Sequence, residues 1–158
     1  MCKIKRNIKR EVIFLMKKLK KDDQLDKTPK YTVKDVAELM NVSAHTVRYY
    51  DNEGLIPFVS RTQSNVRKFS DYNLSWFKMV HCLRATDLSI SDIKTYINLC
   101  LKGNKTIPQR AKIIFDQEKK LEEHLKELQD QMKLLQKKKK YYNNLLKNKS
   151  NDVWNPFK

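Results

Sequence analysis

The stretch from Ser43 to Tyr49 gathers side chains that can hydrogen-bond to bases and phosphates. If it is a helix, the hydroxyl and imidazole groups of Ser43, His45 and Thr46 lie in its first turn, where a groove would expose base edges to them. Arg48 and Tyr49 follow, and their guanidinium and phenol groups can donate to phosphate oxygens. A purely structural helix has no need of this combination. The stretch therefore predicts a recognition helix that reads DNA.

Two short helices would position this stretch. The first follows Thr32, a plausible N-cap, and carries Val33, Val36, Ala37 and Met40 on one face. Ser43 is predicted to cap the second helix, which runs from Ala44 to about Asn52 and ends at Gly54 in a C-cap position. A pair of short helices joined by a tight polar turn is typical of a helix-turn-helix.

A small hairpin and two more helices are expected next. Pro57 cannot continue a helix, and residues 58–59 can pair with residues 66–69 across a polar turn to form a wing. Ser70 is predicted to cap a helix over 71–85. Ser89 or Ser91 is predicted to cap another helix, which Gly103 closes.

The C-terminal third of the chain predicts one long helix over residues 109–147, after a linker over 103–108. Apolar residues follow a three-four alternation along it: Ile114, Leu121, Leu125, Leu128, Met132, Leu135, Tyr142 and Leu146. Only Glu118 and Lys139 interrupt the alternation. A chain this short has no neighbour to cover such a stripe, whereas a second copy can, so we expect an antiparallel two-stranded coiled coil that forms a homodimer. A helix folded back on its own domain is the alternative.

Composition narrows the class of protein. The formal net charge is +16 and the pI is near 9.8, which favours a polyanionic partner: nucleic acid or an anionic membrane surface. With two glycines and four prolines, a β-rich fold is disfavoured, and the fold class is expected to be mainly α. Three cysteines, without paired spacing or a Cys/His cluster, indicate neither a disulfide framework nor a metal site. No cofactor, catalytic constellation, membrane span or secretion signal is apparent, so a cytoplasmic protein without enzymatic activity is expected.

Residues 1–30 form a basic extension whose role the sequence leaves open. Apolar residues recur at helical spacing on one face: Ile4, Ile8, Val12, Leu15 and Leu19. A solvated arm and a helix lying on a membrane surface both fit this pattern. In a third interpretation translation begins at Met16, and residues 1–15 are not part of the protein.

Residues 31–102 resemble the N-terminal domain of the MerR family of bacterial transcription regulators. The resemblance is carried by "YTVKDVAELMNVSAHTVRYYDNEGLIP", by Arg61, by "VRKFS" and by "LSISDIKTYINL", and the long helix after them matches the dimer helix of the family. It implies a winged helix-turn-helix dimer that binds a pseudo-palindromic promoter operator. Such a dimer acts with RNA polymerase by bending and untwisting a promoter spacer that is too long.

The resemblance also assigns roles to individual residues. Arg48 and Tyr49 match phosphate and base contacts, and Thr32 matches the helix start that contacts phosphate. The wing positions that match backbone contacts are Arg61, Arg67 and Lys68, whereas His45 and Thr46 fall where the family varies and would set base choice. Two structural alternatives stay open: Tyr50 as a core ring, and Thr32 as a cap only.

Two departures from the family pattern bear on backbone geometry. The wing turn has Asn65 where glycine is usual, and asparagine tolerates a positive φ. The aromatic residue that usually follows is Val66, which puts a wing stacking contact in doubt. Asp87 stands where glycine is usual, so the backbone of the capping turn there is expected to be less favourable.

The inducer is less well specified. Residues 148–158 form a tail too short for a ligand domain, and neither the start of the dimer helix nor the tail has metal-binding cysteines. The chain resembles short family members that respond to reactive carbonyls or thiol stress, and Cys82 matches their single cysteine. A thiolate there could react with an electrophilic aldehyde, although a cysteine between apolar residues is commonly an inert core residue. A non-switching architectural DNA-binding protein, and a coiled-coil or membrane-surface protein, are the other classes considered.

Overall fold

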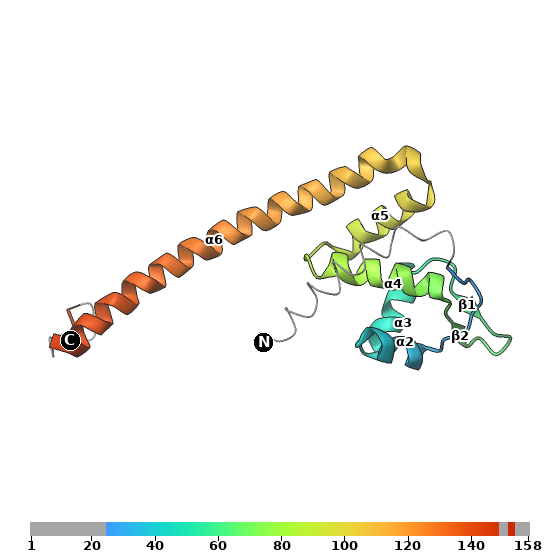
Figure 1. Ribbon diagram of the computed structural model, residues 1–158, viewed down its shortest axis with the longest axis horizontal. Helices are drawn as coiled ribbons and strands as arrows, with labels where there is room; N and C mark the ends of the chain where they lie inside the picture. The colour runs from blue at the N-terminus through green and yellow to red at the C-terminus, as the bar shows by residue number, and fades with distance from the viewer. Residues whose placement is uncertain (1–24, 149–151, 154–158) are drawn as a thin grey trace. The chain divides into compact units, whose positions relative to one another are not determined.

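The computed structural model describes residues 25–148 and 152–153, and within them it is mainly helical (Figure 1). Residues 1–24 of the predicted basic extension and most of the predicted tail lie outside the described residues. The chain divides into two compact units, one ending at Ile113 and the other beginning at Ile114. The first unit is called the head below.

Helices α2 (Val33–Met40) and α3 (Ala44–Asn52) form the predicted helix-turn-helix. Asn41, in a left-handed conformation with φ of 51°, ends α2 and turns the chain toward Ser43. Gly54, with φ of +69°, follows α3, and the amide of Leu55 donates to the Tyr50 carbonyl oxygen at 2.9 Å. The chain therefore leaves α3 at Gly54, as the sequence predicts.

The described part of the head is built around one hydrophobic core. Val36 of α2 and Val47 of α3 are fully buried. Tyr50 is 7% exposed and its ring centroid lies 5.2 Å from that of Phe77, so the interpretation of Tyr50 as a core ring is confirmed. Burial raises the pKa of the Tyr50 phenol. The remaining buried apolar residues are Leu55, Ile56, Phe69, Leu74, Val80, Leu88, Ile93 and Ile97.

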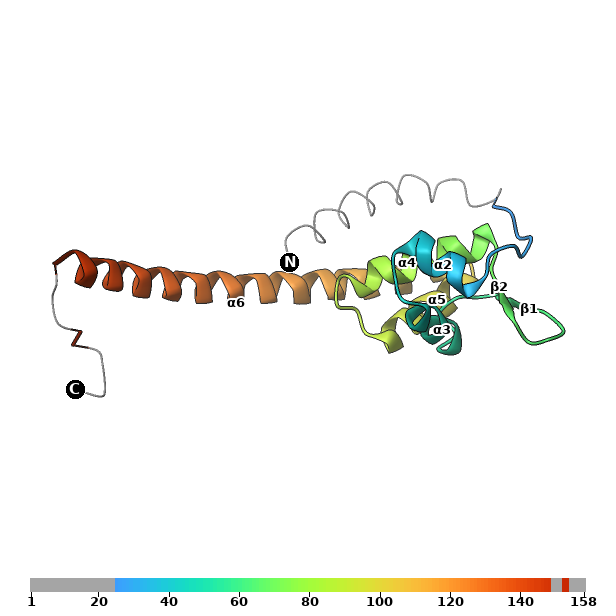
Figure 2. The ribbon, with the colours of Figure 1, turned by 90° about the horizontal axis from the view of Figure 1, so that it is seen from below.

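The wing is a two-stranded antiparallel hairpin, shorter than predicted. Strands β1 (Ser60–Arg61) and β2 (Arg67–Lys68) pair with Ser60 opposite Lys68 and Arg61 opposite Arg67. The hairpin extends beyond the helices of the head (Figures 1 and 2). The predicted strand at residues 58–59 is wrong, because Phe58 has a φ of 63° and cannot be extended. Asn65 has a φ of 61°, as expected for the turn.

Helices α4 (Asp71–Arg84) and α5 (Ile90–Leu101) follow the wing. Ser70 and Asn73 form a capping box at the start of α4, and the Asn73 amide nitrogen also donates to the Pro57 carbonyl oxygen at 2.7 Å. This side chain therefore fixes the entry to the wing. Ser89, rather than Ser91, caps α5.

The segment before α2 is held to the start of α4 by an ion pair and a hydrogen bond. The Lys30 ammonium lies 2.6 Å from an Asp71 carboxylate oxygen, and the Tyr31 hydroxyl donates to the other oxygen at 2.9 Å. The hydrogen bond from Lys30 is the main cause that lowers the pKa of Asp71. These contacts extend the head to residues N-terminal of the predicted boundary at residue 31.

The turn between α4 and α5 carries conformational strain that a substitution should relieve. Asp87 is exposed and has a φ of 63°, a conformation that glycine adopts more readily. Asp87→Gly is expected to stabilise the head by roughly 0.5–1 kcal/mol, or a few degrees in melting temperature. Thermal unfolding followed by circular dichroism measures this difference. Asp87→Ala should be destabilising, and a glycine variant that melts no higher than the unchanged protein would contradict the assignment of strain.

The predicted linker over 103–108 is instead ordered as part of the head. A 3-10 turn, η2 (Asn104–Thr106), leads directly into α6 (Ile107–Asn148). The buried Thr106 hydroxyl donates to the Leu99 and Gly103 carbonyl oxygens at 2.6 and 2.8 Å. This hydroxyl closes the end of α5, and α6 consequently begins two residues earlier than predicted.

Helix α6 has 42 residues, which corresponds to a length of about 63 Å. None of its residues is buried. Among the described residues, no helix combines the length and the apolar character needed to cross a membrane.

Candidate nucleic-acid interface

Helix α3 separates its core residues from its predicted contact residues. Val47 and Tyr50 face the core, whereas His45, Arg48 and Tyr49 are exposed. Positions three and four residues apart share a helix face, so His45 lies beside both Arg48 and Tyr49. The structure thus brings an imidazole, a guanidinium and a phenol together on one solvent-facing surface. These three groups can donate to both base edges and phosphates.

Ser43 and Thr46 support this surface through the helix cap. The Thr46 amide donates to the Ser43 hydroxyl oxygen at 3.0 Å, and the two hydroxyl groups lie 2.9 Å apart. Ser43 is exposed and Thr46 is half-buried. Both hydroxyls therefore stand at the N-terminal end of α3, where the helix dipole favours phosphate.

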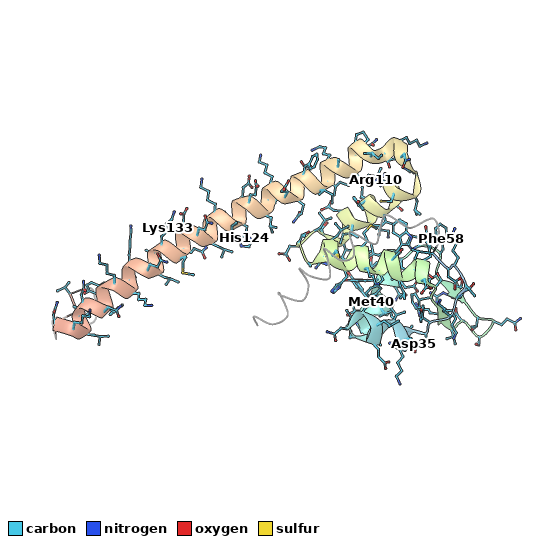
Figure 3. All side chains as sticks on the ribbon, viewed as in Figure 1. Asp35, Met40, Phe58, Arg110, His124 and Lys133 are labelled. Atoms are coloured by element: carbon cyan, nitrogen blue, oxygen red, sulfur yellow. The ribbon has the colours of Figure 1, made fainter. Side chains whose placement is uncertain are left out.

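Thr32 caps α2 through a reciprocal pair of hydrogen bonds with Asp35, which is labelled in Figure 3. The Thr32 hydroxyl donates to the Asp35 carboxylate at 2.9 Å and accepts from the Asp35 amide at 3.2 Å. Hydrogen bonds from the backbone and side chain of Thr32 lower the pKa of Asp35. The capping role of Thr32 is thus observed, and its phosphate contact stays a prediction.

The wing arginines are both bound to the end of α3. The Arg61 Nη2 lies 3.0 Å from Asp51 Oδ2, and the Arg67 Nε lies 2.5 Å from the same oxygen. Arg67 also donates to the Asn52 side-chain oxygen at 2.5 Å. These contacts join the wing to α3, while Lys68 is half-buried on β2.

Sequence reasoning missed Asp51 and Asn52. The available signal was their spacing, because they lie three and four residues after Arg48 and therefore on its side of α3. An acidic residue at the edge of a basic surface needs a cationic partner, and the wing supplies two.

The predicted sensor residue lies away from this surface in sequence. Cys82 is half-buried near the end of α4, two residues after the fully buried Val80. It is neither fully exposed nor sealed within the core.

Helix α6 presents the predicted dimer residues as exposed side chains. Ile114 is 37% exposed, Leu128 49% and Leu146 78%, and the exposures of Leu121, Leu125, Met132, Leu135 and Tyr142 lie between these limits. Leu134 is also exposed but lies outside the three-four alternation. Side chains such as those of His124 and Lys133 stand out along the helix (Figure 3).

Comparison with known proteins decides the family. The sequence model of the family described as "MerR HTH family regulatory protein" matches residues 31–100. An uncharacterized HTH-type transcriptional regulator of Haemophilus influenzae is 36% identical over 112 residues, which are 71% of this chain and 83% of that protein. This chain belongs to the MerR family.

Solved structures of MerR regulators share the fold. One is HiNmlR, described as a MerR family regulator that lacks the sensor domain and is bound to promoter DNA. It is 34% identical, with a TM-score of 0.62, over 76% of this chain and 95% of that chain. A putative MerR family regulator from Listeria monocytogenes is 32% identical, with a TM-score of 0.65, over 74% of this chain and 89% of that chain. The chain is thus a DNA-binding transcriptional regulator of the MerR type, with the winged helix-turn-helix expected from its sequence.

Proposed function

We propose that this MerR regulator binds a pseudo-palindromic promoter operator as a homodimer and acts with RNA polymerase by bending and untwisting the spacer. The observation that carries the proposal is the exposed cluster of His45, Arg48 and Tyr49 on a capped helix beside a basic wing. The DNA-bound state of the similar regulator HiNmlR supports it. The site of action would be the cytoplasm, where promoters and polymerase meet.

In this proposal Arg48 and Tyr49 contact phosphates and adjacent bases, and His45 and Thr46 select the base sequence. The hydroxyls of Ser43 and Thr32 contact phosphate at the two helix starts, and the wing adds backbone contacts. Each of these groups except Thr32 and Thr46 belongs to an exposed or charged side chain. Readout through DNA deformation would add to these contacts.

Dimerisation through α6 would cover its exposed apolar residues. The residues of the three-four alternation are called the seam below: Ile114, Leu121, Leu125, Leu128, Met132, Leu135, Tyr142 and Leu146, with the polar positions Glu118 and Lys139. In an antiparallel pair centred near residue 130, Leu128 packs against Met132 of the second copy. The spacing of the seam positions is symmetric about residue 130, so every seam position of one copy meets a seam position of the other. The polar positions Glu118 and Lys139 then fall in adjacent layers with opposite charges. In a parallel pair each would face its own copy, with like charges together. Charge placement therefore favours the antiparallel dimer, which carries one head at each end.

A footprinting experiment on the promoter region tests the proposal. A short protected palindrome, with hypersensitive cleavage near its centre, is expected because a bent and untwisted spacer exposes its minor groove. Uniform protection without a preferred sequence would instead indicate an architectural DNA-binding protein. That result would contradict the proposed regulator.

We further propose that reactive carbonyl or thiol stress is sensed at Cys82, which is only partly buried. The thiolate would attack an aldehyde carbon, forming a sulfur–carbon bond while the carbonyl oxygen takes up a proton. Formaldehyde is expected to change the footprint of the unchanged protein and of Cys100→Ser, but not of Cys82→Ser. Equal responses of both variants would contradict the role of Cys82.

A further inference from the structure

Two cationic side chains converge on one acidic group where the wing meets the recognition helix. Asp51 is only 9% exposed, and both Arg61 and Arg67 donate to its Oδ2. Arg61 and Arg67 are register partners on β1 and β2, so their side chains project on the same face of the hairpin. The site thus holds one more positive charge than the carboxylate needs.

The two arginines are bound unequally. Arg67 is 20% exposed and makes hydrogen bonds to both Asp51 and Asn52. Arg61 is 40% exposed, and among the described residues only Asp51 forms an ion pair or side-chain hydrogen bond with it. Arg67 is therefore the more firmly held of the two, and Arg61 is the one that solvent or a ligand can reach.

This inequality determines which arginine can leave. Removing the sole partner of a nearly buried carboxylate leaves an uncompensated charge and is strongly unfavourable. Because Arg67 stays on Asp51, the departure of Arg61 leaves the carboxylate neutralised. A phosphate offers Arg61 a charge-assisted hydrogen bond of comparable strength. The exchange of a carboxylate for a phosphate is then nearly balanced.

We propose that Arg67 is a positioning residue that neutralises Asp51, and that it thereby releases Arg61 to bind a DNA phosphate. The inference rests on the proposed function and revises it, since it removes Arg67 from the phosphate contacts. Without Arg67, Asp51 would keep Arg61 for itself. Asp51 thus sets how many wing charges reach the DNA.

The salt dependence of operator affinity tests this coupling. Each phosphate contact contributes about 0.9 to the slope of log affinity against log salt, so losing Arg61 from both heads should lower it by about 1.8. Arg61→Gln should show this loss directly. Arg67→Gln should show the same loss, because Arg61 is then retained by Asp51. Adding Asp51→Asn should restore the slope in the Arg67→Gln background but not in the Arg61→Gln background.

Two further variants control for charge and for folding. Glu53→Gln removes an acidic charge from the same end of α3, but the two wing arginines pair with Asp51 and not with Glu53, so it should not rescue Arg67→Gln. Arg67→Lys keeps a cation near Asp51 and should retain the slope of the unchanged protein. Circular dichroism confirms that each variant is folded.

The possible outcomes distinguish a failure of this inference from a failure of the proposed function on which it rests. A normal slope for Arg67→Gln, or no rescue by Asp51→Asn in folded protein, overturns the inference alone. A reduced slope for Arg67→Lys overturns it as well. If the unchanged protein shows no preference for a promoter fragment over random DNA, the proposed function fails instead.

Discussion

Arg48→Ala is expected to lower operator affinity by at least about thirtyfold, because each of the two heads loses a guanidinium contact worth about 1–3 kcal/mol. Arg48 is exposed beside His45 on the solvent-facing surface of α3, and it makes no contribution to the core. Fluorescence anisotropy with operator and scrambled duplexes measures the effect. Binding to both duplexes should become equally weak.

A matched control separates this loss from a change in total charge. Lys119→Ala removes one exposed positive charge from α6, outside the apolar seam, and should leave operator affinity nearly unchanged. Sedimentation should show the same dimer for both variants. If Arg48→Ala bound the operator as tightly as the unchanged protein, the assignment of α3 as the recognition helix would be wrong.

Leu128→Glu is expected to convert the dimer to a monomer at micromolar concentration. Leu128 lies near the centre of the seam, and two glutamates placed in adjacent central layers would repel each other without water to screen them. Operator affinity should fall by at least about a hundredfold, since each head then binds alone. Analytical ultracentrifugation and anisotropy report the two effects.

The matched control for this change is Leu134→Glu. Leu134 is 62% exposed and lies outside the seam, so its variant should remain dimeric.

The orientation of the two α6 helices has a separate test. Glu118→Lys should weaken the dimer by placing two cations in adjacent layers, and Lys139→Glu in the same chain should restore it. Failure of the second change to restore the dimer would contradict the antiparallel register.

The head could be predicted from sequence because its signals are local. The caps at Thr32, Ser43 and Ser70 need only a hydroxyl and a nearby amide, and α2, α3 and α4 begin after them as expected. The left-handed turn at Asn65 was likewise predictable from the tolerance of asparagine for positive φ. Each of these caps and turns depends on one residue with a specific side-chain or backbone preference, so it can be read from the sequence.

What the sequence did not reveal depends on contacts between distant residues. Phe58 leaves the extended conformation where Asn73, from the next helix, binds the carbonyl oxygen of Pro57. The predicted linker is ordered because Thr106 bonds to the end of α5. The binding of both wing arginines to Asp51 likewise requires the hairpin to fold against α3, which no local pattern encodes.

The absence of buried residues on α6 has a thermodynamic consequence. In the proposed dimer, α6 gains its stability by pairing with a second copy, so its melting temperature is expected to rise with protein concentration. The head has its own core and should melt at a temperature independent of dilution. Two transitions are then expected in calorimetry, and only the α6 transition should move as the sample is diluted. In a cell with few copies, the rate of synthesis would itself govern how much assembled protein exists.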